Sequence, residues 1–147
     1  MLYGTAPAVA NYDGMTASIL IVEDEMLVAL EMQNILEEAG FHVANIASDL
    51  AGALAVADQG LDLALVDLNL RDGLTGPEIG KRLSTEHKAG VLFMTANPRL
   101  LGSGIAGTIG VLSKPTDEAS LLAAVEFALR RRRGEPAEAP PALRCFA

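Results

Sequence analysis

The sequence is poor in cysteine and in aromatic residues, and it contains no long hydrophobic run. The single cysteine, Cys145, excludes an internal disulfide framework, and nothing in the cysteine usage argues for secretion. No apolar stretch is long enough to cross a bilayer, and the first fourteen residues lack the basic start and the continuous apolar region of a signal peptide. We therefore expect a cytoplasmic protein without a membrane segment.

Positive charge is also scarce. The 147 residues include 11 Lys and Arg against 19 Asp and Glu, which gives a formal net charge of -8. This balance disfavours nonspecific attraction to nucleic acid or to anionic lipid, so we expect neither as a partner. The arginines at 130–133 are interpreted as a helix end that complements the helix dipole. His42 and His87 have no cysteine or carboxylate at a metal-ligand spacing.

Five short apolar runs alternate with stretches of helical period, which is the pattern of repeated βα units. Gly40 and Gly60 are expected to end the first two helices, and Pro77 to lie in the first turn of the third. These units predict one α/β domain with a parallel sheet covered by helices on both faces. The predicted strands cover residues 18–22, 41–47, 61–67, 90–94 and 108–113.

The C-terminal third holds one weak and one strong helix signal. Residues 97–107 include four Gly or Pro residues, so we expect at most a short, frayed helix there. The last helix is predicted to begin with Thr116 as its N-cap, with Asp117 and Glu118 in its first turn, and to end at the arginines. The remaining sequence, GEPAEAPPALRCFA at 134–147, is expected to be a disordered tail.

Polar side chains stand where the predicted strands end. Because ligands of such sheets bind beyond the carboxyl ends of the strands, these side chains are expected to meet at one rim. Strand one ends in Glu23 and Asp24, strand three in Asp67, strand four in Thr95 and strand five in Lys114. The sequence therefore predicts three carboxylates, a hydroxyl and an ammonium in one site.

This set of groups favours phosphoryl chemistry with a divalent cation. Crowded carboxylates repel one another, and burial makes their ionised forms costlier still, so a cation would relieve both effects. Mg²⁺ suits hard oxygen ligands and commonly takes one or two carboxylates together with phosphate oxygens. Lys114 and Thr95 offer the positive charge and the donor that a transferring phosphoryl group requires. Asp67, central among them, is placed as the nucleophile.

At these residues the sequence resembles a response regulator receiver domain of two-component signalling. The matching motifs are ILIVEDE, ALVDLNLRDG, FMTAN and VLSKP, in the family's order. The resemblance covers residues 18–133, which leaves 1–17 as an N-terminal tail, of which 1–14 looks dispensable, and 134–147 as the C-terminal tail. It implies a flavodoxin-like, doubly wound, five-stranded parallel sheet in the strand order 2-1-3-4-5.

The resemblance also implies a role for each rim residue. Asp67 would be the phosphoacceptor, receiving its phosphoryl group from a histidine kinase or a histidine phosphotransfer protein. Mg²⁺ would be held directly by Asp24, Asp67 and the backbone carbonyl of Asn69, with Glu23 helping through water. Thr95 and Lys114 would bind phosphoryl oxygens, and the peptide between Lys114 and Pro115 would be cis. The protein would not be an enzyme beyond its own phosphorylation and dephosphorylation.

Two enzyme classes are the alternatives. The segment GSGIAG at 102–107 matches the dinucleotide pattern G-x-G-x-x-G, but it precedes a predicted strand instead of following one, so NAD binding is a poor interpretation. A magnesium-dependent aspartyl phosphatase of the haloacid dehalogenase type also uses an aspartate nucleophile. Its signature places a second acid two residues after the nucleophile, where this sequence has Asn69.

The output is less constrained by the sequence. The 14 residues after position 133 are too few for an output domain, so we expect a stand-alone receiver that signals through protein contacts, or a phosphorelay shuttle that passes the group onward. Receivers usually carry a switch aromatic three residues before the lysine, where this sequence has Val111. Phe127 is interpreted as part of a second apolar face of the last helix, with homodimerisation through that helix as one hypothesis.

Overall fold

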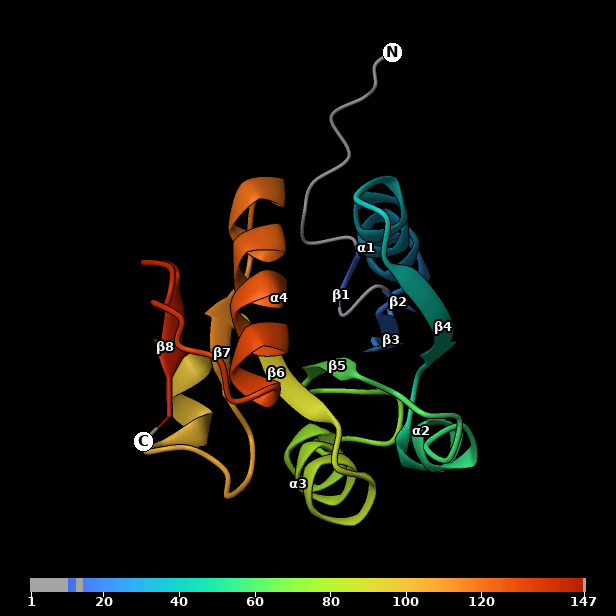
Figure 1. The fold of residues 1–147 in the computed structure, drawn as a ribbon. Helices are drawn as coiled ribbons and strands as arrows, with labels where there is room; N and C mark the ends of the chain where they lie inside the picture. Colours follow the sequence, from blue (N-terminus) through green and yellow to red (C-terminus); the bar gives the residue numbers. More distant parts are fainter. Residues whose placement is uncertain (1–10, 13–14, 147) are drawn as a thin grey trace.

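A computed structural model of the chain describes residues 11–12 and 15–146, and side chains from residue 16 onward. Its main element is a sheet of six strands in the order β4-β3-β5-β6-β7-β8, drawn in Figure 1. The first five in this order are parallel: β4 (His42–Ala47), β3 (Ser18–Val22), β5 (Leu63–Asp67), β6 (Gly90–Thr95) and β7 (Gly110–Ser113). This confirms the predicted order 2-1-3-4-5 and the doubly wound architecture.

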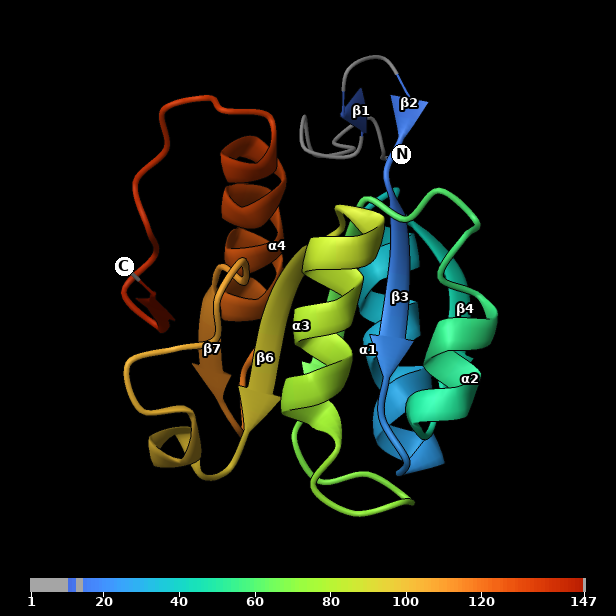
Figure 2. The ribbon, with the colours of Figure 1, turned by 90° about the horizontal axis from the view of Figure 1, so that it is seen from below.

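Helices cover both faces of the sheet, as predicted (Figures 1 and 2). One apolar core joins the sheet to α1 (Met26–Glu38) and α4 (Glu118–Arg132). The other joins it to α2 (Leu50–Ala55) and α3 (Gly76–His87). Strand β6 is buried along its whole length, which is why its sequence is a continuous apolar run and not an alternating one.

The segment between β6 and β7 contains only one short helix, as its glycine and proline content predicted. This is the 3₁₀ helix η2 (Pro98–Leu101), which ends at Gly102. Gly102 and Gly104 both have positive φ, of 53° and 122°, a conformation that side chains other than glycine rarely adopt. The chain therefore turns repeatedly here instead of building a full helix.

The N-cap of α4 corrects one prediction. Thr116 was expected to cap this helix, but α4 begins at Glu118 and its N-cap is Asp117. Asp117 has extended backbone, and its Oδ1 accepts a hydrogen bond of 2.7 Å from the backbone nitrogen of Ser120. A carboxylate at this position satisfies a free N–H group and also meets the positive end of the helix dipole, whereas a threonine hydroxyl would do only the first.

The C-terminal segment corrects a second prediction. Residues 134–147 were expected to be disordered, yet the structure places a strand there, β8 (Leu143–Cys145), antiparallel to β7. Leu143 and Phe146 are buried in the two apolar cores. Composition alone misled the prediction, because β7 would otherwise present an unpaired edge and LRCF supplies a strand to cover it. Residue 147 lies outside the described part.

Phe127 corrects a third prediction. It was expected on an exposed face of α4, but only 4% of its surface is accessible. Phe127 lies in the same apolar core as Leu143, and residues of the segment before β8 line a cavity against its ring. The chain itself thus covers the face that was a candidate for homodimerisation.

The N-terminal residues add a small hairpin of β1 (Asn11–Tyr12) and β2 (Met15–Thr16) ahead of β3. The rest of the expected tail, residues 1–10 and 13–14, lies outside the described residues. None of the helices in the described part is long and apolar enough to cross a membrane.

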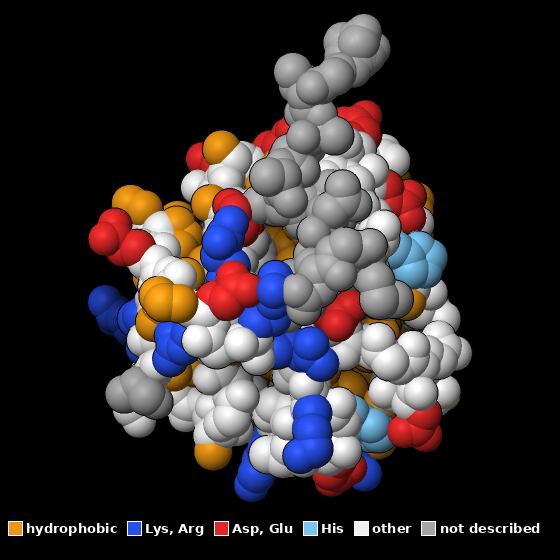
Figure 3. Space-filling view, in the orientation of Figure 1, with side chains coloured by type: hydrophobic (Ala, Val, Ile, Leu, Met, Phe, Trp, Pro, Cys, Tyr) orange, Lys and Arg blue, Asp and Glu red, His pale blue; other side chains and the backbone are white. Residues whose placement is uncertain are grey.

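Basic and acidic side chains are interspersed over the C-terminal end of α4, as Figure 3 shows. Arg130 pairs with Glu126 at 3.0 Å, and Arg132 with Asp62 at 3.2 Å. Arg130, Arg131 and Arg132 lie in the last turn of α4, as expected for side chains that complement the helix dipole.

Candidate functional site

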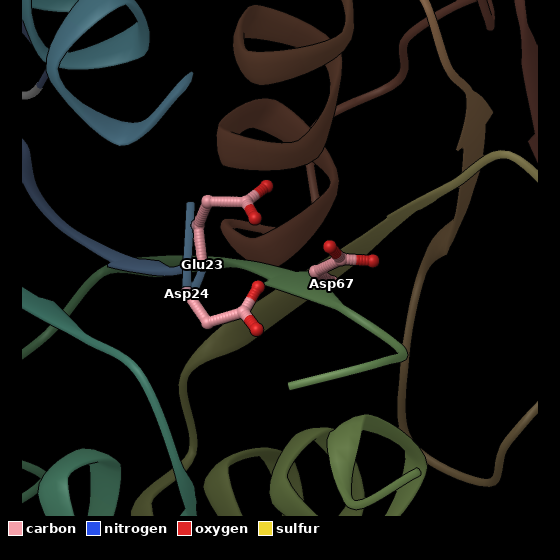
Figure 4. Close-up of side chains that lie close together, drawn as sticks. All are labelled: Glu23, Asp24 and Asp67. Atoms are coloured by element: carbon pink, nitrogen blue, oxygen red, sulfur yellow. The ribbon is translucent and has the colours of Figure 1, made fainter. Parts of the chain in front are cut away.

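The predicted rim residues lie at the carboxyl ends of neighbouring strands. Asp67 ends β5 and Thr95 ends β6, while Glu23 and Asp24 directly follow β3 and Lys114 directly follows β7. Figure 4 shows the carboxylates of Glu23, Asp24 and Asp67 side by side. One ligand oxygen from each of the three lies within 4.8 Å of the others. The structure therefore brings the three predicted carboxylates together.

Lys114 links two of these carboxylates. Its Nζ donates to Glu23 Oε1 at 2.6 Å and to Asp67 Oδ2 at 3.0 Å. Its backbone nitrogen donates to the carbonyl of Thr95 at 2.8 Å, and the peptide between Lys114 and Pro115 is cis, as the resemblance implied. The ammonium therefore lies inside the acid cluster and neutralises part of its charge.

Burial changes the acidity of this pair. The side chain of Glu23 is 2% exposed, and this desolvation raises its pKa in spite of the hydrogen bond from Lys114. Burial alone would lower the pKa of Lys114, but its hydrogen bonds to Glu23 and Asp67 outweigh that effect, so the pKa of the ammonium is raised. The two carboxylates therefore favour the charged form of Lys114, whereas burial makes the ionised form of Glu23 costlier.

Asp67 is held in place but remains accessible. Its Oδ1 accepts a hydrogen bond of 2.7 Å from the backbone nitrogen of Leu68, and its Oδ2 is the atom that Lys114 contacts. The side chain keeps 13% of its surface exposed. A reagent can thus reach a carboxylate whose orientation is already fixed.

A cavity of about 350 Å³ opens beside Asp67. Thr95 is buried at its wall, where its Oγ1 accepts a hydrogen bond of 3.0 Å from the backbone nitrogen of Asn97. The lining includes Asp24, Asp67, Asn69, Thr95, Asn97 and Lys114. All six residues named for the site in the sequence analysis thus lie here. Five line the cavity, and the sixth, Glu23, accepts a hydrogen bond from Lys114.

The donor set fits a magnesium ion. Glu23, Asp24 and Asp67 offer hard carboxylate oxygens, and Asn69 lines the same cavity. Mg²⁺ prefers oxygen ligands and keeps several waters, for which a cavity of this size has room. Asp24 is solvent-exposed, so an ion could bind here without first being stripped of all its water.

Sequence reasoning missed Gly76, which packs closely against the backbone of Asp67 and Leu68. Its backbone nitrogen donates to the carbonyl of Leu68 at 3.1 Å, and a Cβ atom at this position would overlap the carbonyl oxygen of Asp67. A side chain on residue 76 would therefore push the loop after Asp67 aside. The signal was present as a glycine directly before Pro77 at a helix start, but only its helix-starting meaning was considered.

Comparison with known proteins identifies the family. The family model described as the response regulator receiver domain matches residues 19–126. The phyllosphere-induced regulator PhyR of Methylorubrum extorquens is 30% identical over 118 residues, which cover 78% of this chain and 44% of PhyR. The sensory transduction protein RegX3 of Mycobacterium tuberculosis is 31% identical over 125 residues, covering 82% of this chain and 54% of RegX3.

Solved structures agree on the fold. PhyR from Brucella abortus matches with a TM-score of 0.74 at 24% identity, over 86% of this chain and 52% of that one. A CheY-like receiver domain protein from Methanospirillum hungatei matches with a TM-score of 0.70 at 23% identity, over 83% of this chain and 100% of that one. The chain spans about half the length of the curated relatives it matches. The part shared with all of them is the receiver, and this protein belongs to the response regulator receiver family.

Proposed function

We propose that this receiver accepts a phosphoryl group on Asp67 from a histidine kinase or a histidine phosphotransfer protein and signals through protein contacts. The observation that carries this proposal is the position of Asp67. Its carboxylate is oriented by Leu68 and Lys114, stands at the end of a central strand and faces a cavity that a phosphoryl group can enter. These features are the requirements of a nucleophile in phosphoryl transfer.

The chemistry needs little beyond positioning and charge. A carboxylate oxygen of Asp67 attacks the phosphorus atom, the bond from phosphorus to the donor's imidazole nitrogen breaks, and an acyl phosphate forms on Asp67. Lys114 contacts the Asp67 carboxylate and is close enough to bind a phosphoryl oxygen once the group has been transferred. Thr95 can donate a hydrogen bond from its hydroxyl to another phosphoryl oxygen. A magnesium ion held by Asp24, Asp67 and the carbonyl of Asn69 would neutralise charge that Lys114 alone cannot.

Direct labelling tests the nucleophile. With magnesium and acetyl phosphate, the chain should gain the mass of one phosphoryl group, and peptide mapping should place that group on Asp67. Asp67→Asn should abolish the gain. Asp72→Asn is the matched control, since Asp72 lies five residues along the same loop and bonds Thr75 and the backbone of Leu50 instead of the site. Labelling of Asp67→Asn at the rate of the unmodified chain would refute the proposal.

The surface beside the site fits a protein donor. Helix α1 starts two residues after Asp24 and exposes Met26, Leu27 and Leu30, with Leu27 84% accessible. Exposed large apolar side chains grouped at a reactive site favour a protein partner. Leu27→Asp should therefore slow phosphotransfer from a phosphorylated histidine phosphotransfer protein while leaving labelling by acetyl phosphate unchanged. Equal slowing with both donors would show that Leu27 acts on the site and not on docking.

A further inference from the structure

The C-terminal strand β8 covers the edge of the sheet with a short ladder of backbone pairs. It pairs with β7 through Gly110–Cys145, Val111–Arg144 and Leu112–Leu143 in register, and the backbone nitrogen of Phe146 donates to the carbonyl of Ile109 at 3.0 Å. Figure 1 shows β8 alongside β7 at the edge of the sheet. A strand of three residues with a partner on one side only is a weakly held element.

The cover over α4 is also incomplete. A cavity of about 330 Å³ separates the segment before β8 from α4, with Phe127 and Ala123 on the helix side and Pro136 and Pro140 on the other. Most residues from 134 to 142 are exposed. This segment therefore acts as a tether and adds little packing of its own, so that β8 can separate from β7 without unfolding the helix before it.

Two side chains of segment 143–146 contact β6 and the segment that follows it. Arg144 donates from Nη2 to the carbonyl of Pro98 at 3.0 Å and from Nη1 to the carbonyl of Gly102 at 2.9 Å. Phe146 is buried against Phe93, with ring centroids 6.4 Å apart, and its ring fills the space where a Cβ of Gly104 would stand. The contacts of Arg144 and of Phe146 both require η2 and the turn after it to keep their present conformation.

That shape depends on Thr95. The backbone nitrogen of Asn97 donates to Thr95 Oγ1 at 3.0 Å, and the carbonyl of Asn97 accepts from the backbone nitrogen of Leu100 at 3.2 Å. The hydroxyl of Thr95 therefore positions the first turn of η2, and Thr95 also lines the cavity beside Asp67. Pro98 follows Asn97 directly in the chain, so the residue that contacts Thr95 is the neighbour of one whose carbonyl accepts from Arg144.

We propose that β8 is a removable cover of an interaction surface, formed by the β7 edge and the Phe127 face of α4, and that phosphorylation of Asp67 releases it. This inference rests on the proposed function. When the hydroxyl of Thr95 turns to a phosphoryl oxygen, Asn97 loses its acceptor and η2 shifts. Because the guanidinium of Arg144 contacts carbonyls at both ends of this turn, the shift pulls at least one of them away from Arg144.

The surface thus has a defined occupant before phosphorylation, which is the chain's own segment 143–146. It has an apolar residue at each end and a basic residue between them, and it lies antiparallel to β7. A partner that replaces it must add an extended strand to the same edge. Val111 occupies the position where the family usually carries its switch aromatic, and it pairs with Arg144 in this register. The residue that holds β8 in place is therefore the direct partner of that position.

Cys145 provides a reporter for release, because it is the single cysteine and lies partly buried within β8. The full chain is incubated with magnesium, with or without acetyl phosphate, and each sample is divided between intact mass analysis and timed labelling with a neutral maleimide. Phosphorylation should raise the labelling rate of Cys145 about tenfold, as expected for a shift of a closed population toward an open one. Asp67→Asn should show no rise.

Arg144→Ala tests the fastening itself. It should raise the labelling rate of the unphosphorylated chain and shrink the further rise on phosphorylation. Arg99→Ala is the matched control, because it removes the same charge from an exposed position on η2; it should leave both rates unchanged. Amide exchange of residues 110–112 should rise together with labelling.

The outcomes separate the two proposals. If mass analysis shows phosphorylated Asp67 but the labelling rate is unchanged or falls, β8 is a permanent part of the sheet and this inference is wrong, while the proposed function stands. If Asp67 is not phosphorylated, the proposed function fails, and the inference fails with it.

Discussion

The ammonium nitrogen of Lys114 lies 2.6 Å from a carboxylate oxygen of Glu23, a side chain with 2% of its surface exposed. Glu23 and Lys114 are 91 positions apart in the sequence, and only the parallel order of β3, β5, β6 and β7 brings them together. The buried acid therefore depends on the lysine for its charge balance. The same lysine contacts Asp67, so the charge balance is shared with a second carboxylate.

Lys114→Ala should destabilise the protein and make its stability more dependent on magnesium. Removing one partner of a buried ion pair costs about 3–5 kcal/mol, and we expect the lower end, about 3 kcal/mol, because Lys114 is 20% exposed. Urea unfolding with and without magnesium measures both effects. Lys81→Ala, on the exposed side of α3, is the charge-matched control. A variant that unfolds like the control at every magnesium concentration would contradict this account.

Magnesium should stabilise the unmodified chain through the acid cluster. At ten times the dissociation constant of the ion, the free energy of unfolding should rise by about 1.4 kcal/mol. Asp24→Asn should remove most of this gain, because it deletes one of the three clustered carboxylates. Asp58→Asn is the control, since its side chain is 92% exposed and pairs with His87 away from the rim. Thermal melts that do not respond to magnesium would count against a metal site.

Gly76→Ala should disturb the loop that follows Asp67. The added methyl group would overlap the carbonyl oxygen of Asp67 and the Cα of Leu68, so the loop must move. Overpacking of this kind costs about 1–3 kcal/mol, and the rate of labelling by acetyl phosphate should fall as well. Gly52→Ala within α2 is the control, because its nearest contact is a side-chain oxygen of Asp49 at 3.1 Å and no backbone atom lies closer than 4.0 Å. Labelling at the rate of the unmodified chain would show that Asp67 tolerates the shift.

The rim was predictable from the sequence because each of its members ends a recognisable strand. Parallel strands place their carboxyl ends at one edge, so five short apolar runs were enough to bring Glu23, Asp67 and Lys114 together. The motifs also predicted the helices on both faces, since those depend on local period and end signals. What could be predicted was thus local pattern combined with one rule of topology.

The errors arose where distant segments decide the structure. Residues 134–147 look disordered by composition, but Leu143 and Phe146 find buried positions on an edge that the local sequence does not reveal. The same segment hides Phe127, whose position on α4 alone suggested exposure. The N-cap of α4 was displaced from Thr116 to Asp117 for a local reason, because two adjacent residues could each cap the helix and the carboxylate gains more from the dipole.

Phe127→Ala should now be a test of folding stability. Because the ring is 4% exposed and lies in the apolar core that also contains Leu143, its truncation should cost about 3–5 kcal/mol. Urea unfolding of this variant beside Leu27→Ala, which truncates an exposed apolar residue, measures the difference. The Leu27 variant should lie within about 0.5 kcal/mol of the unmodified chain. If Phe127→Ala were equally harmless, the C-terminal segment would not cover α4 in solution.

The N-cap of α4 should give the protein an acid-sensitive component of stability. The hydrogen bonds from Ser120 hold the pKa of Asp117 below its ordinary value of 3.8. A carboxyl group whose pKa is lower in the folded state contributes stability above its unfolded pKa, and that contribution is lost as the pH falls from about 3.8 through the lower folded pKa.

Asp117→Ser keeps a capping oxygen but removes the titrating group. The unmodified chain should therefore be the more stable of the two near pH 6, and the gap should close as the pH is lowered below 3.8. Urea unfolding at a series of pH values measures the gap, and Asp117→Ala, which has no capping oxygen, should be the least stable variant near pH 6. A gap between the unmodified chain and Asp117→Ser that stays constant down to the acid limit would show that the carboxylate stabilises α4 only as a hydrogen-bond acceptor.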